Sequence, residues 1–339
     1  MAEQVSGRAW LQALLDFEAA LARAQVGAGI IGAEDAERIA AVCDAARYDV
    51  AEIGAGAAEI GNPAGAVVKA LQAAAPGAPV HLGATSQDAV DTAAMLVAKR
   101  ALVPLLDDLR GAADAAAGLA REHRGTPIMG RTLLQAAKPT TFGLKAAGWM
   151  TGLDEAAAGL RRVRLASQTG GPVGTAVPLD LQQLGLEAPL LPWHTERTRI
   201  GELAGALGVA AGAAGKAALD VILLSQTEVA AVRERTGGGS TSMPHKHNPV
   251  AAISALGCAK QAPGLVATLL AAMVGEHERA AGAWQSEWKP LSDLLLLTGS
   301  AAAWLHEALD GLEVDAQRMR VDGDTGAAAT LVDRALENR

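Results

Sequence analysis

Three short polar segments of the sequence combine hydroxyl, amide and cationic side chains in a spacing that could bind an anion. They are residues 81–88 (HLGATSQD), 130–135 (GRTLLQ) and 237–249 (GGGSTSMPHKHNP). Each lies next to a segment of helical composition, and free backbone N–H groups and the helix dipole favour an anion at a helix start. One such segment alone predicts a helix cap or a loop. Three of them on a chain with few other loops favour a binding site for a negatively charged ligand.

Other kinds of site find little support in the sequence. No glycine-rich nucleotide-binding motif is present, and Cys43 and Cys258 do not form a zinc pattern. His245 and His247 could bind a metal ion, but no acidic or cysteine partner lies near them in sequence. We therefore expect no metal and no organic cofactor.

Composition limits the class of protein that must position these segments. The chain has 339 residues, 50% of them hydrophobic and 19% charged, and a formal net charge of −8. The acidic balance argues against nucleic acid as a partner. The N-terminus lacks the apolar run of a secretory signal, and the apolar stretches are shorter than the roughly 20 residues of a membrane span. These features predict a cytoplasmic protein with no membrane contact.

The pattern of apolar residues predicts an all-α fold of long helices. Alanine and leucine dominate, β-branched residues are sparse, and no segment alternates with a period of two. Met95, Leu102 and Leu109 recur every seven residues, as in helices that pack along one stripe. Ser86 is the expected N-cap of the first long helix. We expect helices over residues 87–124, 140–168, 196–235, about 249–277 with a bend at Pro263, and 291–309.

Residues 239–249 (GSTSMPHKHNP) resemble the signature of the fumarase/aspartase superfamily, whose pattern is close to GSSxMPxKxNP. Segments 81–93 and 130–143 match that superfamily in order and spacing. Residues 275–291 (GEHERAAGAWQSEWKPL) are similar to its 3-carboxy-cis,cis-muconate cycloisomerase branch. The resemblance covers roughly residues 8–320. His247 departs from it, because arginine is common at that position.

This resemblance implies an L-aspartase-like long-helix bundle that assembles as a homotetramer, with active sites built by loops from three subunits. It divides the chain into an N-terminal helical domain (1–80), a central bundle with the three loops (81–310) and a short remnant of the C-terminal domain (311–339). Family members usually continue for a further helical domain beyond that point, so the third domain is expected to be nearly absent.

The resemblance also implies the reaction: lactonisation of 3-carboxy-cis,cis-muconate to 4-carboxymuconolactone, in the protocatechuate branch of aromatic catabolism. An internal carboxylate would add to the alkene, and Ser240, supported by Lys246, would protonate Cα. Arg279 could bind the additional carboxylate. The residues expected to bind the small polycarboxylate substrate are Thr85, Ser86, Gln87, Arg131, Gln135 and Asn248.

Leu133 agrees with this chemistry. Fumarase-like members carry a histidine at the corresponding position, which helps with proton transfer on the leaving side. Hydroxide is a poor leaving group, because the pKa of water is about 15.7. A carboxylate, whose conjugate acid has a pKa of about 4, leaves or attacks unaided. An apolar residue at 133 therefore favours a cycloisomerase over a hydratase.

Two alternatives remain open from the sequence. One is an adenylosuccinate-lyase-like C–N lyase, because HLGATSQD and MPHK also suit that branch. The other is a catalytically inactive scaffold or partner subunit of the same superfamily, suggested by the shortened C-terminus and by Leu133.

Overall fold

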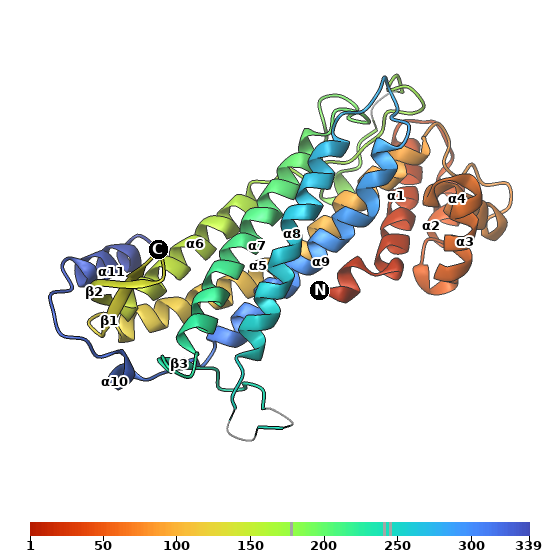
Figure 1. Cartoon of the computed structure of the whole chain (residues 1–339). Coiled ribbons are helices and arrows are strands. Elements are labelled where there is room, and N and C mark those ends of the chain that lie inside the picture. The colour runs from red at the N-terminus through yellow and green to blue at the C-terminus, as the bar shows by residue number, and fades with distance from the viewer. Residues whose placement is uncertain (177–178, 240–241, 244–245) are drawn as a thin grey trace. The chain divides into compact units, whose positions relative to one another are not determined.

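The computed structural model describes residues 1–176, 179–239, 242–243 and 246–339. It confirms the predicted all-α fold, with two small antiparallel strand pairs added (Figure 1). The helices are α1 (Gly7–Gly27), α2 (Ala33–Ala40), α3 (Val50–Ile60), α4 (Pro63–Ala74), α5 (Ser86–Glu122), α6 (Phe142–Arg161), α7 (Thr198–Leu224), α8 (Val250–Ala272), α9 (Ala283–Leu309), α10 (Ala316–Met319) and α11 (Ala328–Glu337). The strands are β1 (Pro127–Thr132), β2 (Gln135–Thr141), β3 (Val232–Arg233) and β4 (Glu313–Val314).

The chain forms two compact units, each assembled from three separate segments. The first unit contains Met1–Leu102, Val163–Glu202 and Ala267–Leu295. The second contains Val103–Arg162, Leu203–Val266 and Leu296–Arg339. These units are defined by compactness and are discontinuous in sequence, so the three-part division into 1–80, 81–310 and 311–339 stays a prediction.

Helix boundaries differ from the sequence prediction in four helices, because α8 also ends earlier than expected, at Ala272. Helix α6 ends at Arg161. Helix α7 ends at Leu224, because the Ala231 N–H donates to the Leu224 carbonyl at 2.9 Å and the chain continues into β3. Helix α9 begins at Ala283 and runs through Pro290. The sequence prediction began this helix at Leu291, and a proline inside a helix removes one backbone hydrogen bond. Here the helix continues on both sides of it.

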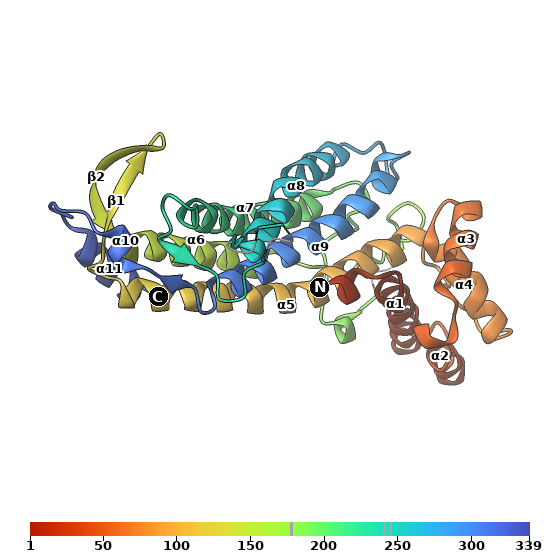
Figure 2. The same ribbon diagram turned by 60° about the horizontal axis from the view of Figure 1, so that its bottom comes forward.

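Alanine and leucine form the helical core of each unit. Met95, Leu102 and Leu109 are all buried, which confirms the predicted stripe. In the second unit, α7 and α8 lie side by side in both views (Figures 1 and 2). A side chain at Gly215 of α7 would meet Ala259 of α8, its Cβ only 2.8 Å from the alanine Cβ. Small residues therefore set the close approach of these two helices.

Helices α7 and α8 are long and apolar enough, by length and composition alone, to cross a membrane. Less than half of their most apolar windows is buried within the chain: 44% for α7 and 28% for α8. Both helices are longer than the apolar stretches identified in the sequence, because each helix also contains residues outside those stretches. Their uncovered faces carry Val209, Leu219 and Ile253.

The first unit encloses a network of buried charges around Arg197, the residue that immediately precedes α7. Its guanidinium donates to both carboxylate oxygens of Asp91, at 2.8 and 3.1 Å. It also donates to both carboxylate oxygens of Glu287, and the bond from Nε to Oε1 is 3.0 Å long. The indole of Trp284 also donates to Asp91, at 3.0 Å. Burial acts to lower the pKa of Arg197, but the charges of Asp91 and Glu287 outweigh it and raise that pKa. The network connects the first turns of α5, α7 and α9.

Replacing Arg197 with leucine should lower the free energy of unfolding by about 3–5 kcal/mol, because it leaves two buried carboxylates unpaired. The measurement is urea denaturation followed by circular dichroism. Arg164→Leu is the matched control: Arg164 pairs with Glu202 at 3.8 Å on the surface of the same unit, and its loss should cost less than about 1 kcal/mol. Equal losses in the two variants would contradict this role of the network.

Candidate active site

The segment 81–88 lies in the first unit and leads into α5. Sequence analysis placed the N-cap at Ser86, but the structure places it one residue earlier. The Thr85 carbonyl accepts from the Asp88 amide at 2.9 Å, and the Asp88 carboxylate accepts from the Thr85 amide at 3.0 Å. The Asp88 side chain thus satisfies the Thr85 amide, as the acidic residue three positions on does in a capping box, while the Thr85 hydroxyl accepts from Arg279 instead. Ser86 is therefore the first residue of the helix, and its hydroxyl is not needed as the cap.

Asp88 fixes this segment from inside the protein. Its fully buried carboxylate also accepts from the amides of Gly170 (2.8 Å) and Gly171 (2.9 Å) and contacts His194 Nε2 at 2.8 Å. Burial acts to raise the pKa of Asp88, but the hydrogen bonds from His194, Gly170 and Thr85 outweigh it and lower that pKa. Asp88 therefore stays ionised at neutral pH and holds the loop to the helix start.

Arg279 joins Thr85 and Ser86 at the start of α5. Its guanidinium donates to the Thr85 hydroxyl, lies 3.5 Å from the Ser86 hydroxyl and packs 5.7 Å from the ring centre of Trp284. Arg279 forms no salt bridge with any carboxylate in the part of the chain that the structure describes. The group combines a cation, two hydroxyls and a helix N-terminus, which suits a carboxylate ligand.

Gln87 lies away from this surface. It is fully buried, and its amide donates to Asp91 Oδ2 at 3.1 Å and to the His194 carbonyl at 2.7 Å. The sequence predicted a substrate contact for Gln87. This position favours a supporting role, because the side chain connects the Arg197 network to the loop.

His81, which begins the same segment, was not predicted as a site residue. Its φ is 62°, and its Nδ1 lies 2.5 Å from Oε1 of the buried Glu18 on α1. Oε2 of Glu18 is buried, and no group among the described residues donates a hydrogen bond to it. The only signal in the sequence was a histidine at the start of the motif, and its partner lies 63 residues away.

The segment 130–135, which was expected as a loop, forms the tip of the β1–β2 hairpin in the second unit. Thr132 pairs with Gln135, so Leu133 and Leu134 are the two turn residues. Their φ values are 50° and 65°, and they are 96% and 70% exposed. Such a turn normally selects asparagine and glycine, because left-handed backbone is costly for bulky side chains. Arg131 on the same hairpin is exposed and reaches the Leu134 carbonyl at 3.4 Å.

The third segment, 237–249, connects β3 with α8 in the second unit. Ser240, Thr241, Pro244 and His245 lie outside the described residues, so the predicted proton donor Ser240 is not placed. Lys246 is exposed, and Asn248 is half-buried. Asn248 and Gly238 exchange two backbone hydrogen bonds of 2.8 and 2.9 Å, which close the base of this segment.

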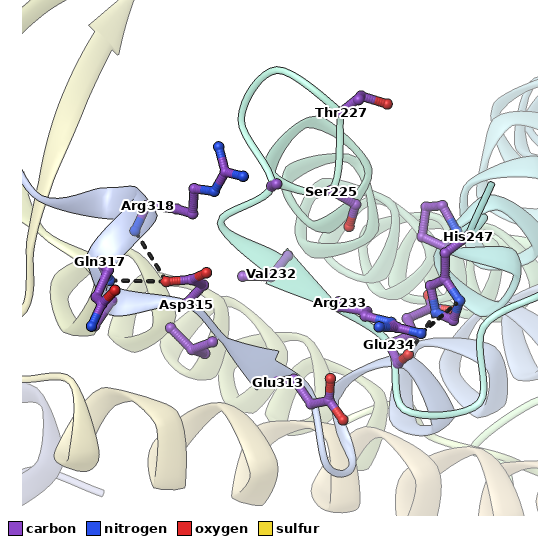
Figure 3. Close-up of a pocket in the computed structure, with 14 residues that line it drawn as sticks. Ser225, Thr227, Val232, Arg233, Glu234, His247, Glu313, Asp315, Gln317 and Arg318 are labelled. Atoms are coloured by element: carbon purple, nitrogen blue, oxygen red, sulfur yellow. Dashed lines mark hydrogen bonds between the residues drawn. The ribbon is translucent and has the colours of Figure 1, made fainter. Parts of the chain in front are cut away.

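A pocket of about 880 Å³ lies beside the base of this segment (Figure 3). Its lining mixes polar and apolar groups and carries charges of both signs, including Arg233, Glu313, Asp315 and Arg318, with His247 beside them. Neither Lys246 nor Asn248 is among its lining residues. The described residues also contain no group of three potential metal ligands.

The structure thus groups the predicted residues into three sets. Thr85 and Ser86 meet Arg279 in the first unit. In the second unit, Arg131 and Gln135 share the hairpin, and Lys246 and Asn248 share the segment before α8. Each set consists of donors and cations suited to an anionic ligand.

His81 and Glu18 make stability depend on pH. Burial acts to lower the pKa of His81, but the hydrogen bond and charge of Glu18 outweigh it and raise that pKa above the ordinary 6.5. The stabilisation is therefore complete below pH 6.5 and is lost as the pH rises through the raised value. Thermal unfolding of the wild type between pH 5.5 and 9 should show this loss.

Glu18→Gln removes the charge with little change of shape, and this part of the pH dependence should disappear with it. Glu37→Gln, on the exposed side of α2, should leave the wild-type profile unchanged. A Glu18→Gln profile parallel to that of the wild type would show that the pair remains uncharged.

Comparison with known proteins identifies the same family as the three polar segments do. The family model described as lyase matches residues 1–264. The chain is 47% identical to a 3-carboxy-cis,cis-muconate cycloisomerase of Bradyrhizobium diazoefficiens, in an alignment covering 94% of this chain and 75% of that protein. It is 40% identical to a nitrosuccinate lyase of Streptomyces davaonensis, covering 97% and 76% respectively.

Among solved structures, the 3-carboxy-cis,cis-muconate lactonizing enzyme from Pseudomonas putida matches with a TM-score of 0.87 and 38% identity. That match covers all of this chain and 84% of the other. The family model, the relatives and this structure agree. The chain therefore belongs to the lyase family of the fumarase/aspartase superfamily, on the branch that contains the 3-carboxy-cis,cis-muconate cycloisomerases.

Proposed function

We propose that this protein is a cycloisomerase that lactonises 3-carboxy-cis,cis-muconate to 4-carboxymuconolactone, a step of aromatic catabolism. The observation that carries the proposal is the 47% identity to a curated cycloisomerase along 94% of the chain. The local structure supports it: Thr85, Ser86 and Arg279 bring two hydroxyls and a cation together at a helix start, which suits a carboxylate.

In the proposed mechanism, a carboxylate oxygen of the substrate attacks its own alkene and forms the C–O bond of the lactone. The alkene electrons move toward the neighbouring carboxylate, and that dianion is stabilised by preorganised donors. Ser240 then gives its proton to Cα, and Lys246 supports the resulting alkoxide. Arg279, Thr85 and Ser86 hold one carboxylate, while Arg131, Gln135 and Asn248 contact the others. No metal or organic cofactor takes part.

Leu133 supports this choice of reaction. It occupies the hairpin tip with its side chain 96% exposed, and it offers no proton. A reaction in which the attacking group is already an ionised carboxylate needs none there. An apolar side chain such as that of Leu133 would also exclude water from a surface that it contacts in an assembly.

The direct test is the loss of the ultraviolet absorbance of 3-carboxymuconate, whose conjugated diene disappears on lactonisation. Purified protein should consume the substrate and yield the lactone. Chelator treatment should leave the rate unchanged. Absence of turnover would favour the inactive scaffold or partner-subunit alternative.

The relative that acts on nitrosuccinate makes a C–N lyase the second candidate. Elimination from nitrosuccinate releases nitrite, a weak base that also leaves without an acid at position 133. The same purified protein should therefore be assayed with nitrosuccinate and with adenylosuccinate. Turnover of either one in preference to the muconate would replace the proposed substrate.

We also propose that the protein is a cytoplasmic homotetramer with shared active sites. Val209 and Ile253 on α7 and α8 are 63% and 48% exposed, and a second copy would cover them. The exposed, left-handed Leu133 and Leu134 also favour an interface, since contacts would offset the cost of their backbone conformation. Cys43 and Cys258 are both free, as suits a reducing compartment.

Replacing Ser240 with alanine should lower kcat by about 10²–10⁴-fold, because a positioned proton donor contributes that much. Assembly and stability should be retained. The measurement is the muconate assay at saturating substrate, with Ser242→Ala as the neighbouring control. If Ser242→Ala is the more damaging variant, the proton donor has been assigned to the wrong serine.

Light scattering coupled to size-exclusion chromatography should give four times the 34.4 kDa chain mass. Val209→Asp should shift the protein to smaller species, because it places a charge on an apolar face. Leu190→Asp, at a loop position that is 94% exposed, should remain tetrameric. A wild-type monomer at micromolar concentration would exclude both the tetramer and the shared site.

A further inference from the structure

His247 occupies a defined place at the base of the segment 237–249. Its Nε2 lies 2.9 Å from the Glu234 carbonyl oxygen, and its Nδ1 lies 3.4 Å from Arg233 Nη2. A carbonyl only accepts, so Nε2 carries the hydrogen. A guanidinium only donates, so Nδ1 must offer its lone pair. Figure 3 shows His247 beside Arg233 and Glu234. The two contacts together require a neutral imidazole with the proton on Nε2.

The anchor for this imidazole is itself rigid. The Glu234 side chain is buried, and its two oxygens accept from the amides of Ala251 (3.1 Å) and Ala252 (2.8 Å) in the first turn of α8. A carboxylate at a helix N-terminus is favoured by the free amides and the dipole. Because Glu234 is fixed to α8 by its side chain, the bond from His247 to its backbone ties the segment to a helix.

The surrounding backbone leaves room for the ring. A Cβ at Gly237 would lie 2.2 Å from His247 Nε2 and 2.9 Å from the Asn248 carbonyl oxygen. Gly237 thus provides the space in which the imidazole lies. The next residue, Gly238, forms the two-bond bridge with Asn248, so ring and bridge close the segment at the same point.

We infer that His247 is a positioning residue, which fastens the base of the segment 237–249 to Glu234 and thereby sets the geometry of its neighbours Lys246 and Asn248. The expected effect of His247 on turnover rests on the proposed function. Its expected effect on the backbone bridge between Gly238 and Asn248 does not. An arginine at this position could not accept a bond from Arg233, because a guanidinium only donates.

The test compares His247→Leu, which keeps apolar bulk without donors, with His247→Gln, whose amide N–H can replace Nε2–H. Amide hydrogen exchange, read by mass spectrometry on fragments covering 237–249, should be at least roughly tenfold faster in His247→Leu. In His247→Gln it should stay within about threefold of the wild type. Exchange across the middle of α8 should be unchanged in both variants, which shows that the fold is intact.

Turnover should follow exchange: kcat falls roughly tenfold or more in His247→Leu and is largely rescued in His247→Gln. His306→Leu, on α9 in the same unit, should alter neither quantity at this segment.

Wild-type exchange in His247→Leu, or equal damage in the two variants, would overturn the positioning role. If the protein fails to consume muconate at all, the exchange measurement still decides the inference.

Discussion

The rest of the first unit depends on one buried arginine. A guanidinium that is almost fully removed from water must be paired, and Arg197 has Asp91 and Glu287 as its partners. Asp91 is in the first turns of α5, and Glu287 is in those of α9, while Arg197 itself precedes α7. The starts of three long helices are thus fixed by one charge. Gln87 and His194 extend the same network to Asp88, so the loop at 81–88 is held in place by buried groups.

The three predicted segments are built in different ways. Segment 81–88 is fixed from inside by buried carboxylates, which makes its hydroxyls and Arg279 a preorganised group. Segment 130–135 is a hairpin tip whose two leucines adopt left-handed backbone while facing solvent. Segment 237–249 is closed by a backbone bridge and the imidazole of His247. Arg131 and Lys246, on the two segments of the second unit, are therefore exposed, whereas Thr85 and Ser86 in the first unit are half-buried.

The chemistry agrees with this distribution of groups. Preorganised donors stabilise a dianion because they require no reorganisation when charge develops. Lactonisation needs that stabilisation and one proton, but no protein group to activate the nucleophile. An exposed leucine at the hairpin tip is compatible with such a reaction. It would be a poor replacement for the acid that a hydratase needs.

The sequence by itself determined the helical class, the three polar segments and the family, because helix periodicity and the spacing in MPHKHNP are local properties of the chain. It also placed the first long helix within a residue or two of its observed bounds. Only the tertiary structure showed that Gln87 is buried, that Glu18 pairs with His81, and that Arg197 connects three helices. Each of these depends on a partner far away in sequence, from 63 to more than 100 residues. The hairpin at 127–141 was missed for a related reason: two left-handed leucines contradict the residue preferences of turns, so no local rule predicts them.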